Sequence, residues 1–107
     1  MSNKWIKTCN KSDVSEEGPY CFAVSTEKNI AIYKIDEQFF CTDDLCTHGN
    51  ASLSEGFQDD GIIECPFHGG AFNIRTGEPT SYPCINAIRT YPVKIEDDTI
   101  MVAYDGE

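Results

Sequence analysis

The sequence has few histidines, few basic residues and no long apolar run. Its 107 residues include two histidines, and 8 lysines and arginines stand against 18 aspartates and glutamates, which gives a net charge of −10. This acidic balance argues against a nucleic-acid partner, because phosphates would be repelled, and against anionic membrane surfaces. No apolar stretch approaches the roughly 20 residues that span a bilayer, so we expect no membrane association.

The N-terminus also lacks a hydrophobic segment. Residues 1–7 read Met-Ser-Asn-Lys-Trp-Ile-Lys, without the apolar stretch of a secretory signal. We therefore expect a cytoplasmic protein whose thiols stay reduced. Four of its cysteines lack the spacing of metal ligands and are expected to be small buried hydrophobic residues: Cys9, Cys21, Cys41 and Cys84.

Both histidines lie beside the two remaining cysteines. The first motif is Cys46-Thr-His48-Gly and the second is Cys65-Pro-Phe-His68-Gly-Gly, with 65 − 48 − 1 = 16 residues between them. Thiolate and imidazole are the ligands that iron–sulfur, zinc and related sites prefer. Four such donors in two loops predict a metal site formed by Cys46, His48, Cys65 and His68.

The apolar pattern predicts an all-β protein. Short runs rich in β-branched and aromatic residues are separated by turns such as Asp36-Glu37 and Glu96-Asp97-Asp98, which is typical of an antiparallel sandwich or barrel. Only residues 53–58 could form a helical turn. The predicted strands cover residues 5–9, 20–24, 30–35, 39–41, 61–65, 71–74, 88–95 and 99–104.

The two motifs lie in the middle third of the chain, and strand-rich sequence precedes and follows them. We expect a single domain over residues 1–107, with a β base formed by 1–43 and 75–107. A small insert, residues 44–74, would carry the two ligand loops and bring them together at one tip. Residues 80–84 are a candidate for a third loop over the site.

The two motifs resemble the Rieske [2Fe–2S] signature, in which two His replace two Cys on one iron. The resemblance implies that Cys46 and Cys65 bind the inner iron, and that His48 and His68 bind the outer iron. Two ferric ions, two sulfides and two thiolates sum to zero charge, whereas four thiolates would leave two negative charges. Reduction is easier from the neutral core, which raises the potential above the about −400 mV of plant-type clusters.

Four positions separate this chain from respiratory and photosynthetic Rieske proteins. Those proteins have cysteines, joined in a disulfide, where this sequence has Ala51 and Phe67. They have Ser and Tyr, whose hydroxyls donate to the cluster and raise its potential, where this sequence has Gly70 and Phe72. The resemblance therefore implies a low-potential member, near the bottom of the roughly −150 to +300 mV range.

The closest resemblance is to the Rieske-type ferredoxins of bacterial aromatic-ring-hydroxylating dioxygenase systems. It is carried by residues 46–56, 64–73, Thr76-Gly77 and 89–95. The resemblance implies a soluble, monomeric one-electron carrier without a catalytic site of its own. Its partners would be an NAD(P)H-dependent flavin reductase, which supplies electrons, and a terminal Rieske oxygenase, which receives them.

Three alternatives can be weighed. A terminal oxygenase needs a second, mononuclear iron site with two further histidines, and both histidines of this short chain are already used. A structural Cys2His2 zinc module fits the ligand types, although Cys-x-His is unusual in such modules. The chain could also be a small Rieske subunit of another oxidoreductase, such as a nitrite reductase.

Acidic residues flank both motifs in the sequence. If they surround exposed histidines, they would guide a basic surface on the reductase and the oxygenase toward the cluster. The candidates are Asp43, Asp44, Glu55, Asp59, Asp60 and Glu64.

Overall fold

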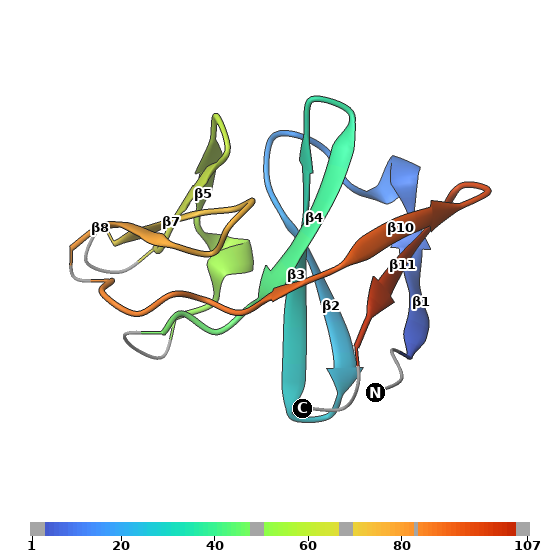
Figure 1. The fold of residues 1–107 in the computed structure, drawn as a ribbon, viewed down its shortest axis with the longest axis horizontal. Helices are drawn as coiled ribbons and strands as arrows, with labels where there is room; N and C mark the ends of the chain where they lie inside the picture. The colour runs from blue at the N-terminus through green and yellow to red at the C-terminus, as the bar shows by residue number, and fades with distance from the viewer. Residues whose placement is uncertain (1–3, 48–50, 67–69, 83, 105–107) are drawn as a thin grey trace.

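The computed structural model describes residues 4–47, 51–66, 70–82 and 84–104. Within these ranges the chain forms eleven strands and two short 3-10 turns, and it has no helix long and apolar enough to cross a membrane. The strands form three antiparallel sheets (Figure 1). The all-β prediction is confirmed.

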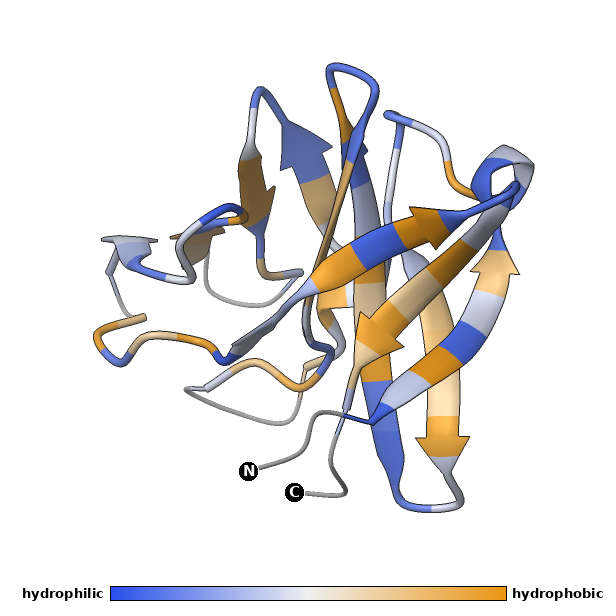
Figure 2. Ribbon diagram, turned by 45° about the vertical axis from the view of Figure 1, so that its right-hand side comes forward, coloured by the Kyte–Doolittle hydropathy of each residue, from blue (hydrophilic) through white to orange (hydrophobic). Residues whose placement is uncertain are grey.

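The first sheet joins the two ends of the described chain. Strand β11 (Thr99–Ala103) lies between β1 (Trp5–Asn10) and β10 (Val93–Glu96). Its register pairs Trp5 with Ala103 and Val93 with Val102. Hydrophobic and hydrophilic residues alternate along β1 and β10 (Figure 2), whereas four consecutive residues of the central strand β11, Ile100 to Ala103, are buried.

The second sheet contains β2 (Tyr20–Ser25), β3 (Lys28–Ile35), β4 (Gln38–Asp43) and β9 (Thr90–Tyr91), in that order. The β3–β4 hairpin turns at Asp36 and Glu37, whose φ angles are 51° and 69°. Positive φ at both central residues is the geometry that matches the twist of the flanking strands. The predicted turn at Asp36-Glu37 is confirmed.

Strand β3 is buried on both faces because it lies between two cores. Ile30 and Ile32 face a core enclosed by the first two sheets, whereas Ala31, Tyr33 and Ile35 face a second core. Burial of an isoleucine side chain contributes about 1.5–3 kcal/mol. This one strand therefore attaches the second core firmly to the first.

The third sheet covers that second core. It consists of β5 (Phe57–Asp59), β6 (Ile62–Glu64), β7 (Ala71–Asn73) and β8 (Pro79–Ser81). The short turn η2 (Leu53–Glu55) precedes β5, and the other turn, η1 (Lys11–Asp13), follows β1 in the base. One apolar cluster beneath the sheet contains Cys46, Cys65 and Cys84 together with Leu53 of η2, Ile63, Phe72 and Ile74, which directly follows β7. The three cysteines thus lie in the core that the third sheet covers.

The prediction of one strand over residues 88–95 is wrong. The chain changes sheets at Pro92: β9 pairs with β4 in the second sheet, and β10 pairs with β11 in the first. Proline lacks a backbone N–H and interrupts the ladder. Its carbonyl still accepts a hydrogen bond of 3.0 Å from the Ala103 N–H.

Strands β5 and β8 were not predicted. The helical turn expected within residues 53–58 is present but ends at Glu55.

Candidate metal centre

Each cysteine motif begins a loop, and an equivalent backbone hydrogen bond closes each of the two loops. The Cys46 N–H donates to the Ala51 carbonyl at 2.9 Å, and the Cys65 N–H donates to the Gly70 carbonyl at 2.7 Å. Each bond joins a cysteine to the residue five positions later. The two predicted thiol ligands therefore occupy equivalent positions at the bases of two matched loops.

The two thiols are buried in the same core. Cys46 and Cys65 each have a relative exposure of 2%, and both belong to the cluster beneath the third sheet. Cys84, predicted as a buried hydrophobic residue, is indeed buried, but its Sγ lies 3.7 Å from Sγ of Cys46. Burial raises the pKa of the Cys84 thiol, its hydrogen bond with Cys46 lowers that pKa, and the Cys65 charge raises it. Three thiols are thus close together.

The predicted histidine ligands, His48 and His68, lie outside the described residues, as does Pro83 of the candidate third loop. In the described part of the chain, no group of three or more His, Cys, Asp or Glu side chains is arranged to hold a metal ion. The three neighbouring thiols are therefore not a metal site by themselves. Only the cysteine half of the predicted donor set can be placed.

A buried carboxylate fixes both ends of the first loop. The Asp44 side chain accepts hydrogen bonds from the Ser52 hydroxyl and, at 2.8 Å, from the Ser54 N–H. Its backbone carbonyl accepts from the Leu53 N–H at 2.7 Å, and Asp44 is only 4% exposed. The expectation that Asp44 faces a partner is wrong, because its charge is used inside the loop.

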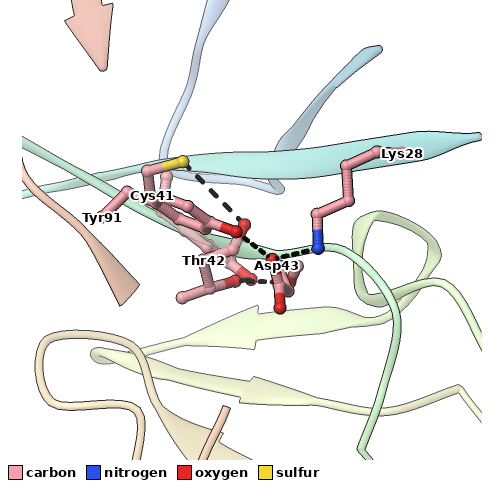
Figure 3. A network of polar contacts seen from close by, with 6 residues as sticks. Lys28, Cys41, Thr42, Asp43 and Tyr91 are labelled. Carbon is pink, nitrogen blue, oxygen red and sulfur yellow. Dashed lines mark hydrogen bonds and ion pairs between the residues drawn. The ribbon is translucent and has the colours of Figure 1, made fainter. Parts of the chain in front are cut away.

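Asp43 is also engaged within the molecule (Figure 3). Its carboxylate lies 2.7 Å from Nζ of Lys28 and accepts a hydrogen bond from the Tyr91 hydroxyl, which comes from β9. Burial raises the pKa of Tyr91, and the hydrogen bond to Asp43 raises it further. This network ties the end of β4, directly before the first loop, to β3 and β9. Sequence reasoning missed it, because the partners are 15 and 48 residues away.

The other acidic candidates are exposed, but they do not share one location. Glu64 precedes Cys65 and pairs with Phe57, so Glu64 and Glu55 lie near the base of the second loop. Asp59 and Asp60 lie at the opposite end of the β5–β6 hairpin. Asp60 is three residues from Phe57, which is about 10 Å along an extended strand. Only Glu55 and Glu64 therefore remain candidates for a charged rim.

Apolar side chains are exposed beside the buried thiols. Leu45, next to Cys46, is 60% exposed, and Tyr82 and Ile85, on either side of Cys84, are 85% and 72% exposed. Large apolar side chains exposed close together are typical of interaction surfaces. No sequence pattern distinguished Leu45 and Ile85 from core residues, because each of them is next to a buried cysteine.

The donor set fits an iron–sulfur cluster. Two buried thiols stand at the bases of matched loops, and each is followed after two or three residues by a histidine. Thiolates are the usual ligands of such clusters, and paired histidines on one iron are the Rieske variant. Burial of the thiols keeps water from the sulfur atoms, which is a further determinant of potential.

Comparison with known proteins gives the same result. The family model of the Rieske [2Fe-2S] domain matches residues 4–92. The ferredoxin component of the naphthalene 1,2-dioxygenase system of Pseudomonas putida is 39% identical over 102 residues, which is 95% of this chain and 97% of that protein.

Two solved structures have the same fold. The ferredoxin of Sphingomonas yanoikuyae B1 is 42% identical with a TM-score of 0.91, covering 95% of this chain and 100% of that one. A chain in the complex of reduced oxygenase and oxidized ferredoxin in carbazole 1,9a-dioxygenase is 41% identical with a TM-score of 0.88, covering 95% and 94%. The predicted Rieske fold, cluster and electron-carrier role are confirmed. The chain belongs to the Rieske [2Fe–2S] family and is a Rieske-type ferredoxin of the aromatic-ring-hydroxylating dioxygenase kind, an electron carrier.

Proposed function

We propose that Cys46 and Cys65 bind one iron of the [2Fe–2S] cluster and that His48 and His68 bind the other. The observation that carries this assignment is the matched closure of the two loops, from Cys46 to Ala51 and from Cys65 to Gly70, with each thiol buried at the loop base. Each histidine falls within the span that its loop hydrogen bond closes. Both loops can thus present one sulfur and one imidazole to the same cluster.

The bound cluster supplies one-electron chemistry, and the chain's residues control where and how easily it occurs. The buried cysteines hold the inner iron away from solvent. The Asp44 hydrogen bonds and the Asp43–Lys28–Tyr91 network fix the first loop on the base, so little rearrangement accompanies the gain or loss of charge. His48 and His68 are the groups through which the electron arrives and leaves.

The cluster-binding unit comprises residues 44–74 together with β8. Strand β8 pairs with β7 in the third sheet, and the Cys84 region that follows contacts Cys46. Residues 1–43 and the segment after residue 88 supply the base. The burial of β3 on both faces supports this arrangement, because one strand contributes side chains to both cores.

The partners are an NAD(P)H-dependent flavin reductase and a terminal Rieske oxygenase. A ferredoxin 41% identical to this chain forms a complex with the oxygenase of carbazole 1,9a-dioxygenase. The exposed Leu45, Tyr82 and Ile85 provide an apolar contact area around the buried thiols. The carrier acts as a monomer, since one docking face must serve two partners in turn.

The cytoplasm is the proposed location. All six cysteines lie in the described part of the chain, and none forms a disulfide. Cytoplasmic thiols stay reduced, and a reducing compartment suits a protein in which the two proposed ligand cysteines and Cys84 lie close together.

Ligand substitution tests the assignment. Cys46→Ser and Cys65→Ser should lose most of the bound iron and the visible absorption, whereas Cys9→Ala, a buried cysteine of the base, should keep two irons per chain. Full iron in either serine variant would contradict the assignment. The partner proposal is tested by NADH-driven electron flow through a dioxygenase reductase to its oxygenase, which should require the iron-loaded protein.

A further inference from the structure

Cys84 contacts one of the proposed ligands but is not itself among them. Its Sγ lies 3.7 Å from Sγ of Cys46, within hydrogen-bonding distance for two sulfur atoms, and the two residues are 3% and 2% exposed. The Cys84 N–H donates to the Ser81 carbonyl at 3.1 Å, which places the thiol at the turn directly after β8. A third segment of the chain therefore reaches the cysteine of the first loop.

The second loop is shaped around the same thiol. A Cβ atom added to Gly70 would lie 2.4 Å from Sγ of Cys84 and 3.2 Å from its backbone nitrogen. Gly70 is the residue whose carbonyl closes the second loop onto Cys65. The Cys84 thiol thus fills the space that a side chain at residue 70 would occupy, and it is wedged between the two loops.

The chemistry of the contact sets its direction once a cluster is bound. A cysteine that ligates iron is a thiolate and has no proton to donate. The S–H of Cys84 must then be the donor and the Cys46 sulfur the acceptor, although S–H is a weak donor. Hydrogen bonds to ligand sulfur atoms favour the reduced, more negative state of an iron–sulfur centre. Burial strengthens such a bond, because the surrounding medium has a low dielectric constant.

We infer that Cys84 is a positioning residue that sets the reduction potential, by donating a hydrogen bond from its thiol to the sulfur of Cys46. The inference deepens the proposed function and rests on its assignment of Cys46 as a ligand. It concerns a side chain that sequence reasoning placed among the ordinary core residues.

The test is the midpoint potential of the iron-loaded protein, measured by redox titration with EPR detection. Cys84→Ala removes the donor, Cys84→Val removes it while retaining most of the side-chain volume, and Cys84→Ser replaces it with a hydroxyl. The reduction equilibrium should weaken by up to about tenfold in the Ala and Val variants, which corresponds to about 59 mV for one electron. The Ser variant should return toward the wild-type potential. Cys9→Ala should leave the potential unchanged.

Each other outcome has a distinct meaning. Equal shifts in the Ala, Val and Ser variants would show a packing effect and overturn the inference, as would an unchanged potential in the Ala and Val variants. Loss of iron from all three variants would show that Cys84 is needed to retain the cluster rather than to set its potential, and would also overturn the inference. If the wild-type protein itself gave no Rieske EPR signal, the ligand assignment would fail before the variants were compared.

Discussion

Gly70 and Cys84 lie so close together that an added Cβ at residue 70 would be 2.4 Å from Sγ of Cys84. Respiratory and photosynthetic Rieske proteins have a serine at the position that matches Gly70. In this chain a thiol from a third segment occupies that space. The close contact with Cys84 therefore requires glycine at residue 70, in addition to any need for a flexible backbone in the loop.

Gly70→Ser should therefore destabilise the protein. If the space beside residue 70 were open, the new hydroxyl would instead be expected to raise the reduction potential of the cluster. Overpacking of this kind costs about 1–3 kcal/mol, and iron incorporation should fall with it. The double variant Gly70→Ser/Cys84→Ala should recover part of the loss, because the colliding sulfur is removed. Urea unfolding and iron analysis check both results. Equal stability of Gly70→Ser and wild type would contradict the close packing.

Asp44→Ala should loosen the first ligand loop. The substitution removes the acceptor for the Ser52 hydroxyl and the Ser54 N–H, and lost hydrogen bonds to a charged group cost about 1.5–3 kcal/mol. Denaturant unfolding should show this loss, together with faster release of iron to a chelator.

Asp59→Ala is the matched control for that experiment. Asp59 is an exposed aspartate of β5 at the far end of the third sheet, where a substitution usually changes stability by less than about 0.5 kcal/mol. If the two variants unfolded and lost iron alike, the internal role of Asp44 would be wrong.

Alkaline pH should destabilise the fold through groups buried in their neutral form. Burial is the main cause of the raised pKa values of Tyr33, Tyr91 and Cys41, whereas in the unfolded chain tyrosine and cysteine titrate near about 10 and 8.5. Above those values the folded state binds more protons than the unfolded state, so the free energy of unfolding must fall as pH rises. Below about pH 8 this contribution is fully present.

Tyr91→Phe isolates one of these groups. Above about pH 10, the dependence of its unfolding free energy on pH should be less steep than in wild type, by up to about 1.4 kcal/mol per pH unit. Urea titrations between pH 8 and 11 measure the two slopes. The comparison uses slopes because the variant also loses the hydrogen bond to Asp43. Identical slopes would show that Tyr91 ionises equally well in the folded protein.

Electron transfer to the oxygenase should depend on the acidic residues near the second loop. Glu64→Gln and Glu55→Gln should lower the second-order rate constant at low salt by roughly twofold or more, and should weaken its dependence on ionic strength. Asp60→Asn, at the distant hairpin turn, is the control and should have a smaller effect. Equal effects at all three positions would indicate a response to net charge alone. The visible spectrum should not change in any variant.

The sequence predicts the strands of five or more residues, such as β3 and β11, because a long run rich in β-branched and aromatic residues identifies the element. It does not predict β5 and β8, which have three residues each and too little pattern to read. The change of sheet at Pro92 depends on which strands lie nearby, and that information is absent from local periodicity.

In the candidate site, too, some residues can be predicted from the sequence and others cannot. Ligand spacing predicts Cys46 and Cys65, because cluster chemistry limits the residue types that can serve. The supporting residues escape such reasoning, because their roles arise from contacts between segments distant in sequence. Asp44 looks like a surface charge until its serine partners are placed, and Cys84 looks like a core residue until Cys46 is found beside it.

The central claim is that Cys46, His48, Cys65 and His68 hold a Rieske cluster. The most direct measurement is low-temperature EPR of the dithionite-reduced protein, together with iron and zinc analysis of the same sample. The assignment predicts two irons per chain and a rhombic signal whose average g value lies below that of clusters with four cysteine ligands. A colourless, EPR-silent protein that contains one zinc per chain would contradict it.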